Sequence, residues 1–269
     1  MTIGRDLLFQ LLEHYEVDYI FGNPGTTELS FIDGAYHHPR INYVSALHEA
    51  IAVGMAMGYA RQTGKHGVVL LHVAPGLANG MGNLYNAYRA GIPLVVLAGQ
   101  HHSHLLLEEP ILAGDHVGQV KSMTKWSHEV RHVDELPLAL HRAFKEAITP
   151  PTGPVFLSVP YNIALEPTKV ERLPAPTRIA TEFCAQEDML EAIAQELLEA
   201  ERPLILVGDG VGLAEALEEV NELALLVGAG VMVEPMPSCQ NFDNRKDYFL
   251  GTLPMKAAGI REELARHDL

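Results

Sequence analysis

Three stretches of the sequence carry groups that could do chemistry, and each follows a short apolar run. The segment Asn23-Pro24-Gly25-Thr26 follows the first run, Glu49 follows the second and His72 follows the third. They offer a hydroxyl group, a carboxylate and an imidazole, which are common participants in proton transfer. If the three stretches meet at one place in the fold, they form a candidate catalytic site.

Glu49 is notable because it begins a helical stretch that is apolar on almost all sides. No charged residue follows it until Arg61. A helix without a polar face is buried in a core or an interface, so this carboxylate is expected in low-dielectric surroundings. Such ionisable groups are common at functional sites. An acidic residue in the first turn also interacts favourably with the helix dipole, and this stretch alone leaves both readings open.

His72 and the histidines at 101–104 could each have a functional or a structural role. Taken alone, His72 is most simply a hydrogen-bonded core residue, but its place at a strand end, just before Pro75-Gly76, favours a functional role. The run His101-His102-Ser103-His104 suggests a zinc or copper site. Adjacent histidines in a strand point to opposite faces, and no carboxylate stands nearby until Glu108. We therefore expect a loop there and assign no metal ligand in this chain.

Short strands that are apolar on both sides alternate with helices over the first part of the chain. Such a pattern predicts an α/β fold in which a mainly parallel sheet is covered by helices on both faces. In this fold the strands' carboxyl ends share one edge, where ligands bind, and all three chemical groups fall there. A long irregular connection is expected at 99–127. The expected strands are 17–21, 41–47, 68–72, 93–98 and 155–159, and the expected helices are 4–15, 27–35, 49–63, 74–89 and 136–148.

The second part of the chain predicts another, Rossmann-like α/β domain. Prolines and charges mark a linker at 166–185, between a domain at 1–165 and a domain at 186–269. The second domain is expected to be incomplete, because two strands make a poor sheet. Its Gly208-Asp209-Gly210 lacks the dinucleotide-binding spacing and is expected to be a turn between strand and helix. The expected elements are helices 186–200, 212–227 and 255–266 and strands 203–207 and 230–234.

Composition limits the possible partners and the compartment. The 269 residues carry a formal net charge of −15, which argues against binding to nucleic acid or to anionic membrane surfaces. The chain has 2 cysteines, too few for a disulfide framework, and begins without a signal-peptide pattern. No uncharged run is long enough to span a membrane. A cytoplasmic protein without nucleic-acid or membrane partners is expected.

Several ordered segments resemble one known family. From Asp6 to about Ile260 the chain resembles the N-terminal half of the thiamin-diphosphate-dependent 2-oxo-acid decarboxylases, most closely the benzoylformate decarboxylases. The similarity extends over one whole domain and is more specific than a single motif. The segments that carry it are Phe21-Gly22-Asn23-Pro24-Gly25-Thr26-Thr27-Glu28, Leu47-His48-Glu49-Ala50, Asn83-Leu84-Tyr85-Asn86-Ala87, Leu97-Ala98-Gly99-Gln100, Lys125-Trp126-Ser127 and Gly153-Pro154-Val155-Phe156-Leu157-Ser158-Val159-Pro160-Tyr161.

This resemblance implies a role for each candidate residue. Residues 1–165 would bind the pyrimidine ring of thiamin diphosphate, and Glu49 would hydrogen-bond that ring and drive its activation. His72 would transfer protons near the carbonyl group of a 2-oxo acid substrate. Thr26 falls where the benzoylformate decarboxylases have a serine that contacts the substrate carboxylate, so its extra methyl group bears on substrate shape.

The same resemblance places other parts of the site. Asn23, Pro24 and Gly25 would line the cofactor side of the wall that carries Thr26. The diphosphate group and its Mg²⁺ would be held by a C-terminal domain that this chain lacks, so the chain alone is expected to be inactive. Family members assemble as homodimers or homotetramers with active sites between subunits. The expected reaction converts a benzoylformate-like 2-oxo acid to an aldehyde and carbon dioxide. The alternatives are an acetolactate-synthase-like carboligase or lyase and a catalytically inactive fragment or subunit.

Overall fold

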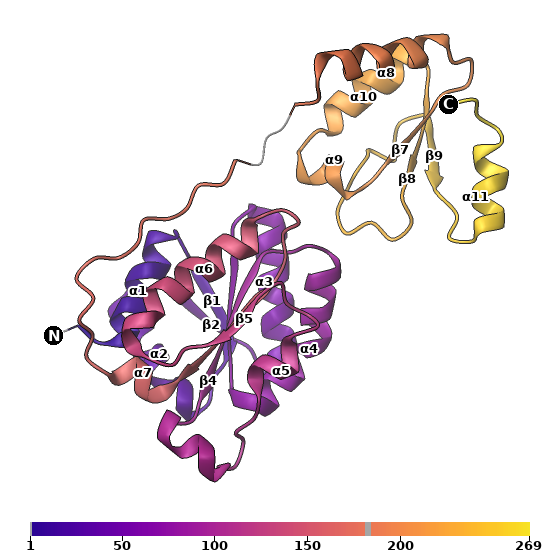
Figure 1. The fold of residues 1–269 in the computed structure, drawn as a ribbon. Helices are drawn as coiled ribbons and strands as arrows, with labels where there is room; N and C mark the ends of the chain where they lie inside the picture. Colours follow the sequence, from indigo (N-terminus) through magenta and orange to yellow (C-terminus); the bar gives the residue numbers. More distant parts are fainter. Residues whose placement is uncertain (1, 181–183) are drawn as a thin grey trace. The chain divides into compact units, whose positions relative to one another are not determined.

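The computed structural model describes residues 2–180 and 184–269 (Figure 1). The chain divides into two compact units, Met1–Thr181 and Glu182–Leu269. Each unit contains its own parallel sheet. Within the described ranges, no helix has the length and apolarity needed to cross a membrane.

Unit 1 is built on a parallel sheet with the strand order β2-β1-β3-β4-β6-β5 in the described residues. The strands at its centre are buried on both faces, which explains why they read as continuous apolar runs. The predicted α/β class with a covered parallel sheet is confirmed. The strands are β1 (Tyr19–Asn23), β2 (Asn42–Ser45), β3 (Gly67–Leu71), β4 (Leu94–Gln100), β5 (Ser127–Glu129) and β6 (Val155–Pro160).

Helices cover both faces of this sheet (Figure 1). Side chains alternate along β3, so that Val68 and Leu70 pack toward α1, α2, α6 and α7, whereas Val69 and Leu71 pack toward α3, α4 and α5. The amphipathic spacing of the helices supplies the matching apolar faces. The helices are α1 (Gly4–His14), α2 (Leu29–His37), α3 (Glu49–Thr63), α4 (Val73–Arg89), α5 (His116–Val120), α6 (Leu136–Ile148) and α7 (Tyr161–Leu165), with 3₁₀ turns η1 (Thr26–Glu28), η2 (Ser103–Glu108) and η3 (Val133–Glu135).

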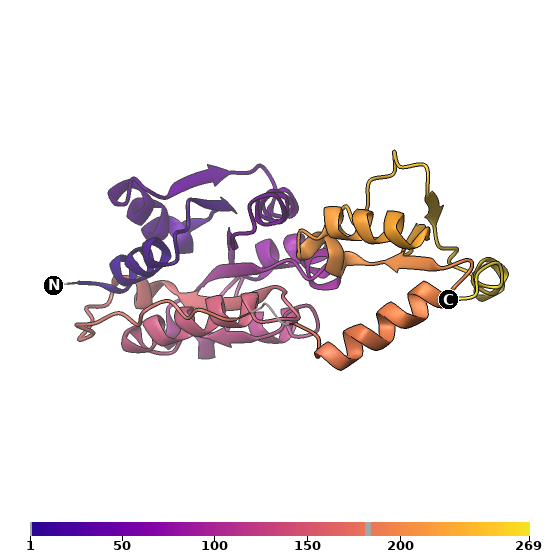
Figure 2. The ribbon, with the colours of Figure 1, turned by 90° about the horizontal axis from the view of Figure 1, so that it is seen from above.

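Helix α1 packs against α6 and α7, which come from the opposite end of the unit's sequence. Figure 2 shows this neighbourhood from above, with the indigo α1 beside the pink segment that contains α6 and α7. The backbone N–H of Gly4 donates to the carbonyl oxygen of Glu166 at 3.1 Å. The beginning and the end of unit 1 are therefore joined on the face away from α3 and α4.

The prediction of an irregular connection at 99–127 is wrong in part. This stretch contains the last residues of β4, the turn η2, the helix α5 and the first residue of β5. Helix α5 has 5 residues and β5 has 3, so neither is long enough to show a periodic pattern. Strand β5 also lies at the edge of the sheet, where Ser127-His128-Glu129 need not be apolar.

Unit 2 has a parallel sheet with the order β7-β8-β9 in its described part. The prediction of two strands is corrected by β9, whose half-exposed residues and Gly251, at φ +112°, hide a strand pattern. The predicted helix 212–227 is two helices, separated near Glu215 at φ +56°. The elements are β7 (Leu204–Val207), β8 (Gly230–Val233), β9 (Phe249–Thr252), α8 (Glu187–Glu199), α9 (Asp209–Leu213), α10 (Leu217–Val227) and α11 (Ala257–Leu264).

Candidate functional site

The predicted site residues lie at the carboxyl edge of the sheet in unit 1. Asn23 is the last residue of β1 and pairs in register with Leu71, the last residue of β3. His72 follows directly, as the residue that precedes α4. Glu49 is the first residue of α3, beyond the end of β2. The parallel topology therefore brings the three stretches to one edge, as the sequence predicts.

Glu49 is almost completely buried, with 6% of its surface exposed. Its Oε2 accepts a hydrogen bond from Nδ2 of Asn79 at 3.0 Å. Within the part of the chain that the structure describes, Oε1 has no hydrogen-bond partner. An ideal Cβ placed on Gly76 would lie 2.9 Å from Oε1, so the glycine leaves room around this oxygen. One carboxylate oxygen is thus fixed and the other is available to a ligand.

The His72 ring is held by a carboxylate that sequence reasoning did not single out. Nδ1 of His72 lies 2.8 Å from Oε2 of Glu28, and Glu28 is completely buried. The same carboxylate accepts hydrogen bonds from the backbone N–H of Gly25 at 2.8 Å and from Oγ1 of Thr27 at 2.6 Å. Three donors surround one buried carboxylate, as buried charge requires.

This arrangement selects one tautomer of His72. An ionised carboxylate only accepts hydrogen bonds, so Nδ1 carries a proton and donates it to Glu28. Among the described residues Nε2 has no hydrogen-bond partner, and 23% of the side chain is exposed. Nε2 is therefore the nitrogen that could exchange a proton with a ligand.

Two glycines make the Glu28–His72 pair possible. An ideal Cβ on Gly25 would overlap the His72 ring, and one on Gly99 would overlap the Glu28 carboxylate. Gly25 has φ −120° and ψ −161°, an extended conformation that any residue can adopt. Space, and not backbone freedom, is what Gly25 supplies.

The turn from β3 into α4 is strained directly after His72. Val73 has φ +36° and is fully buried. A β-branched residue at positive φ is a genuine outlier, and such strain costs on the order of 1–3 kcal/mol. Strained backbone occurs most often at functional sites, where surrounding packing holds it in place. The strain marks the same turn that positions His72.

Glu49 and His72, two of the predicted site residues, lie close together on either side of Gly76. Gly76 separates Glu49 from His72, because its ideal Cβ would lie 2.9 Å from Oε1 of Glu49 and 3.1 Å from Cβ of His72. Thr26 follows Gly25 and is exposed at the start of η1, whereas Asn23 and Pro24 are half-buried. The hydroxyl group of Thr26 thus lies one residue from the glycine that contacts the imidazole.

Tyr43 completes the surroundings of Glu28. Burial, and then the nearby charge of Glu28, raise the pKa of the Tyr43 phenol. Its buried hydroxyl group has no hydrogen-bond partner among the residues that the structure describes, and an ideal Cβ on Gly22 would overlap it. The phenol therefore stays protonated and neutral beside the carboxylate.

Sequence reasoning missed Glu28 and Asn79 as contributors. Glu28 stands three residues after Gly25, so that one tight turn returns its carboxylate to the Gly25 N–H. Asn79 follows His72 by seven residues, which is two turns of α4 and the same helix face. This i, i+7 spacing is the sequence signal that could have identified Asn79.

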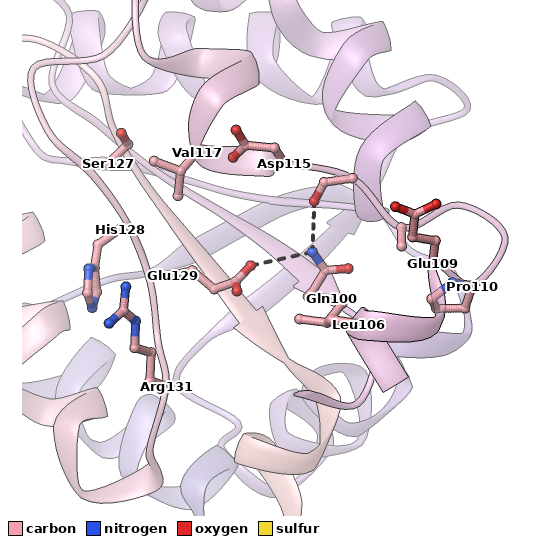
Figure 3. A pocket seen from close by; sticks show the side chains of 12 residues that line it. Gln100, Leu106, Glu109, Pro110, Asp115, Val117, Ser127, His128, Glu129 and Arg131 are labelled. Atoms are coloured by element: carbon pink, nitrogen blue, oxygen red, sulfur yellow. Dashed lines mark hydrogen bonds between the residues drawn. The ribbon is translucent and has the colours of Figure 1, made fainter. Parts of the chain in front are cut away.

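A separate hollow of about 620 Å³ lies at the carboxyl ends of β4 and β5 (Figure 3). At its floor, Nε2 of Gln100 donates to the Gly114 carbonyl oxygen at 3.1 Å and to Oε2 of Glu129 at 3.4 Å. Oγ of Ser158 donates to the same Glu129 oxygen at 3.0 Å. None of the predicted site residues lines this hollow. Its polar floor ties the 101–115 segment to the sheet.

In unit 2, Asp209 and Asn241 come together but satisfy each other. Nδ2 of Asn241 donates to Oδ1 of Asp209 at 3.0 Å, and the backbone N–H of Ser238 donates to the same oxygen at 2.9 Å. Burial alone would raise the pKa of Asp209, but the hydrogen bonds from Asn241 and Ser238 hold that pKa below its usual range. The carboxylate fastens the 236–242 loop to the turn after β7, a structural role.

Comparison with known families gives a consistent assignment for both units. A model described as "Thiamine pyrophosphate enzyme, N-terminal TPP binding domain" matches residues 2–124. A second, described as "Thiamine pyrophosphate enzyme, central domain", matches residues 190–269. Thiamine pyrophosphate is another name for thiamin diphosphate. The chain therefore belongs to the thiamin-diphosphate-dependent enzymes.

Individual relatives show which enzymes of this family the chain is similar to. The chain is 36% identical over 264 residues to a benzoylformate decarboxylase of Pseudomonas aeruginosa, covering 97% of this chain and 49% of the relative. It is 29% identical over 270 residues to an acetolactate synthase large subunit of Haemophilus influenzae, covering 98% of this chain and 47% of the relative. It is thus similar to a decarboxylase and, at lower identity, to a carboligase. The chain spans about half the length of the curated relatives it matches.

Solved structures give the same result. A 4-hydroxybenzoylformate decarboxylase from Rhodococcus jostii RHA1 matches with a TM-score of 0.89 at 30% identity, covering 99% of this chain and 51% of that one. A benzoylformate decarboxylase from Polynucleobacter necessarius matches with a TM-score of 0.90 at 30% identity, covering 100% and 50%. The resemblance inferred from the sequence motifs is confirmed at the level of the family.

Proposed function

We propose that the complete protein is a thiamin-diphosphate-dependent decarboxylase that converts a benzoylformate-like 2-oxo acid to an aldehyde and carbon dioxide. The observation that carries this proposal is the pairing of Glu49, with one free and one fixed carboxylate oxygen, with His72 across Gly76. The similarity to aromatic 2-oxo-acid decarboxylases supports the substrate class. Thiamin diphosphate, when bound, supplies the electron-accepting ring that makes loss of the carboxylate possible.

The residues around Glu49 fit the pyrimidine ring of this cofactor. Oε1, on a side chain that is 6% exposed, has no hydrogen-bond partner in the described chain, and a protonated ring nitrogen would supply one. Gly76 leaves the space beside this oxygen. Glu49 would bind and orient the ring, and would hold the proton shared between the carboxylate and the ring nitrogen. Asn23, Pro24 and Gly25 would line the same wall.

His72 and Thr26 would act on the substrate side. The Glu28 carboxylate fixes the His72 ring through Nδ1, so that Nε2 can donate or accept a proton at the substrate oxygen. Thr26 is exposed one residue from Gly25, and its hydroxyl group would donate a hydrogen bond to the substrate carboxylate. Its methyl group would narrow the space on that side of the substrate.

We place the Mg²⁺ and diphosphate site outside this chain. Asp209 and Asn241 do not fit the ion, because Asp209 already accepts hydrogen bonds from Ser238 and Asn241. Titration of the 269-residue chain with thiamin diphosphate and Mg²⁺ in a calorimeter tests this point. We expect no saturable heat at millimolar cofactor. Saturable, Mg²⁺-dependent binding would place the diphosphate site within these residues and contradict the proposal.

We also propose that the protein acts as a homo-oligomer with active sites between subunits. Large apolar side chains beside the Glu49 site are exposed in the single chain, including Leu47 at 97% and Ile51 at 52%. Tyr85 and Tyr88 of α4 are exposed as well. Exposed apolar patches of this kind mark interaction sites. Light scattering of the complete protein tests the assembly, and an Ile51→Glu variant is expected to dissociate it.

The low cysteine content bears on the compartment. The chain has only 2 cysteines, Cys184 and Cys239, too few for a disulfide framework, and chains poor in disulfides are typical of reducing compartments. We therefore propose a cytoplasmic location, small-molecule substrates, and no nucleic-acid or membrane partner. Localisation of the tagged complete protein by cell fractionation checks this assignment.

Product analysis decides between decarboxylase and carboligase activity. The similarity to acetolactate synthase at 29% identity favours the carboligase as the second candidate. We expect the complete enzyme to release benzaldehyde and carbon dioxide from benzoylformate. Formation of a hydroxyketone from pyruvate at a higher kcat/KM would favour the carboligase. No turnover of either substrate with bound cofactor would support an inactive protein.

A further inference from the structure

One face of α4 contacts the first turn of α3 through two asparagines. Nδ2 of Asn79 donates to Oε2 of Glu49 at 3.0 Å, and Nδ2 of Asn83 donates to the carbonyl oxygen of Ala50 at 2.7 Å. His72, Gly76, Asn79 and Asn83 are spaced by four, three and four residues, so they share one face of the helix. The helix that begins at His72 thus also holds the carboxylate of Glu49.

The two contacts have different purposes. Asn83 binds the backbone of α3 and joins the two helices. Asn79 is exposed at the surface of the single chain, and within the described part of the chain its side chain binds only that of Glu49. Asparagine is a poor helix former, and alanine at such a position favours the helix. Helix stability therefore does not explain an asparagine at position 79.

We propose that Asn79 is a positioning residue for the cofactor: it fixes Glu49 through Oε2 and so presents Oε1 to the pyrimidine ring. This inference rests on the proposed function. Two geometric facts support it. Gly76 keeps the Oε1 side open, and Oε1 has no partner among the described residues. A carboxylate on a flexible side chain would otherwise lose orientation each time the cofactor leaves.

The test compares Asn79→Ala with Asn79→Asp in the complete enzyme. Alanine removes the donor, and we expect the dissociation constant of thiamin diphosphate at fixed Mg²⁺ to rise by roughly 10-fold, the value of one hydrogen bond to a charged group. Aspartate keeps the size of asparagine but places a second carboxylate beside Glu49. We expect it to bind cofactor more weakly than alanine at pH 8 and to recover at lower pH, where the two carboxylates share one proton.

Asn86 provides the matched control. It lies two turns further along α4, is exposed, and donates to Oδ1 of Asn83 at 3.2 Å. Asn86→Ala and Asn86→Asp are expected to leave cofactor affinity unchanged. Circular dichroism of the cofactor-free variants checks that each one is folded at the assay temperature, because loss of the donor to the buried Glu49 carboxylate by itself lowers thermal stability.

The rank order of cofactor affinity among wild type, Asn79→Ala and Asn79→Asp decides whether Asn79 positions Glu49. If Asn79→Asp binds cofactor as well as wild type, or better than Asn79→Ala, the side chain only fills space and the inference is overturned. If the wild-type enzyme binds the cofactor and both Asn79 variants bind it with the wild-type dissociation constant, this inference fails while the proposed function stands. If the wild-type complete enzyme does not bind thiamin diphosphate, both fail.

Discussion

The Nδ1 atom of His72 lies 2.8 Å from Oε2 of Glu28, and the glutamate that makes this contact is completely buried. A buried carboxylate that holds an imidazole in one tautomer is a recurrent device for proton transfer. Here Glu28 is the last residue of η1 and His72 is the residue before α4, both at the same sheet edge, and Gly25 and Gly99 supply the space that the pair needs.

Glu28→Gln should disturb the orientation of His72 without changing cofactor binding. Glutamine keeps the shape but can present its amide to Nδ1, which favours the wrong tautomer. We expect kcat for decarboxylation by the complete enzyme to fall roughly 10²-fold, the low end of what general acid–base catalysis contributes. The dissociation constant for thiamin diphosphate should change little, because Glu49 is untouched. Steady-state kinetics and cofactor titration measure the two effects.

The control for Glu28→Gln is Glu13→Gln. Oε1 of Glu13 also contacts a histidine, with Nδ1 of His38 at 3.2 Å, but on the α1–α2 side of unit 1. That variant should retain wild-type kcat. Equal losses in both variants would mean that the effect of Glu28 is general destabilisation and not the orientation of His72.

Gly25→Ala tests the space beside the imidazole. The added methyl group would overlap the His72 ring, while the extended backbone at Gly25 accepts alanine without strain. We expect kcat to fall by at least roughly 10-fold, because a displaced catalytic group loses near-attack geometry. Stopped assays with benzoylformate provide the measurement.

Gly210→Ala serves as the comparison for this change, because an added Cβ there meets nothing within 4 Å. It should leave kcat at the wild-type value. A Gly25→Ala enzyme with unaltered kcat and an unaltered fold would show that the His72 ring can move without cost. His72 would then have no place in the proton-transfer step.

Glu49→Gln should remove turnover while the fold survives. Glutamine is close to glutamate in size, and its side-chain oxygen can still accept from Nδ2 of Asn79. It cannot share a proton with the ring nitrogen, so we expect a loss of about 10³-fold in kcat. Circular dichroism and thermal melts check the fold, and benzaldehyde release measures activity. A rate near wild type would remove Glu49 from the mechanism.

The sequence predicts where the backbone places the site residues, but it does not predict which side chains pair there. Continuous apolar strands and intervening helices require the covered parallel sheet, and this topology alone places Glu49 and His72 at one edge. The contact of Glu28 with His72 joins residues 44 positions apart, and no local pattern encodes such a distance. Strand β9 is missed for the opposite reason, since its glycine and half-exposed residues weaken a local signal.

Acidification should destabilise the protein through His116. Burial lowers the pKa of this histidine to about 4, from an ordinary value of 6.5. Between pH 6.5 and 4 the unfolded chain therefore binds a proton that the folded chain does not, so the free energy of unfolding falls as the pH falls. The contribution approaches about 3 kcal/mol below pH 4. Urea denaturation at pH 7.5, 5.5 and 4.5 measures the slope.

His116→Gln should reduce this pH dependence, because glutamine does not titrate in this range, whereas His66, whose pKa burial also lowers to about 4, keeps its own contribution. The variant loses a contact with Oγ of Ser158 at 3.2 Å and should be less stable than wild type at pH 7.5, so the comparison concerns the slope and not the absolute stability. His37→Gln is the matched control, since the His37 side chain is 57% exposed and its removal should leave the slope unchanged. An identical slope in wild type and in His116→Gln would show that His116 takes up its proton without unfolding the surrounding structure.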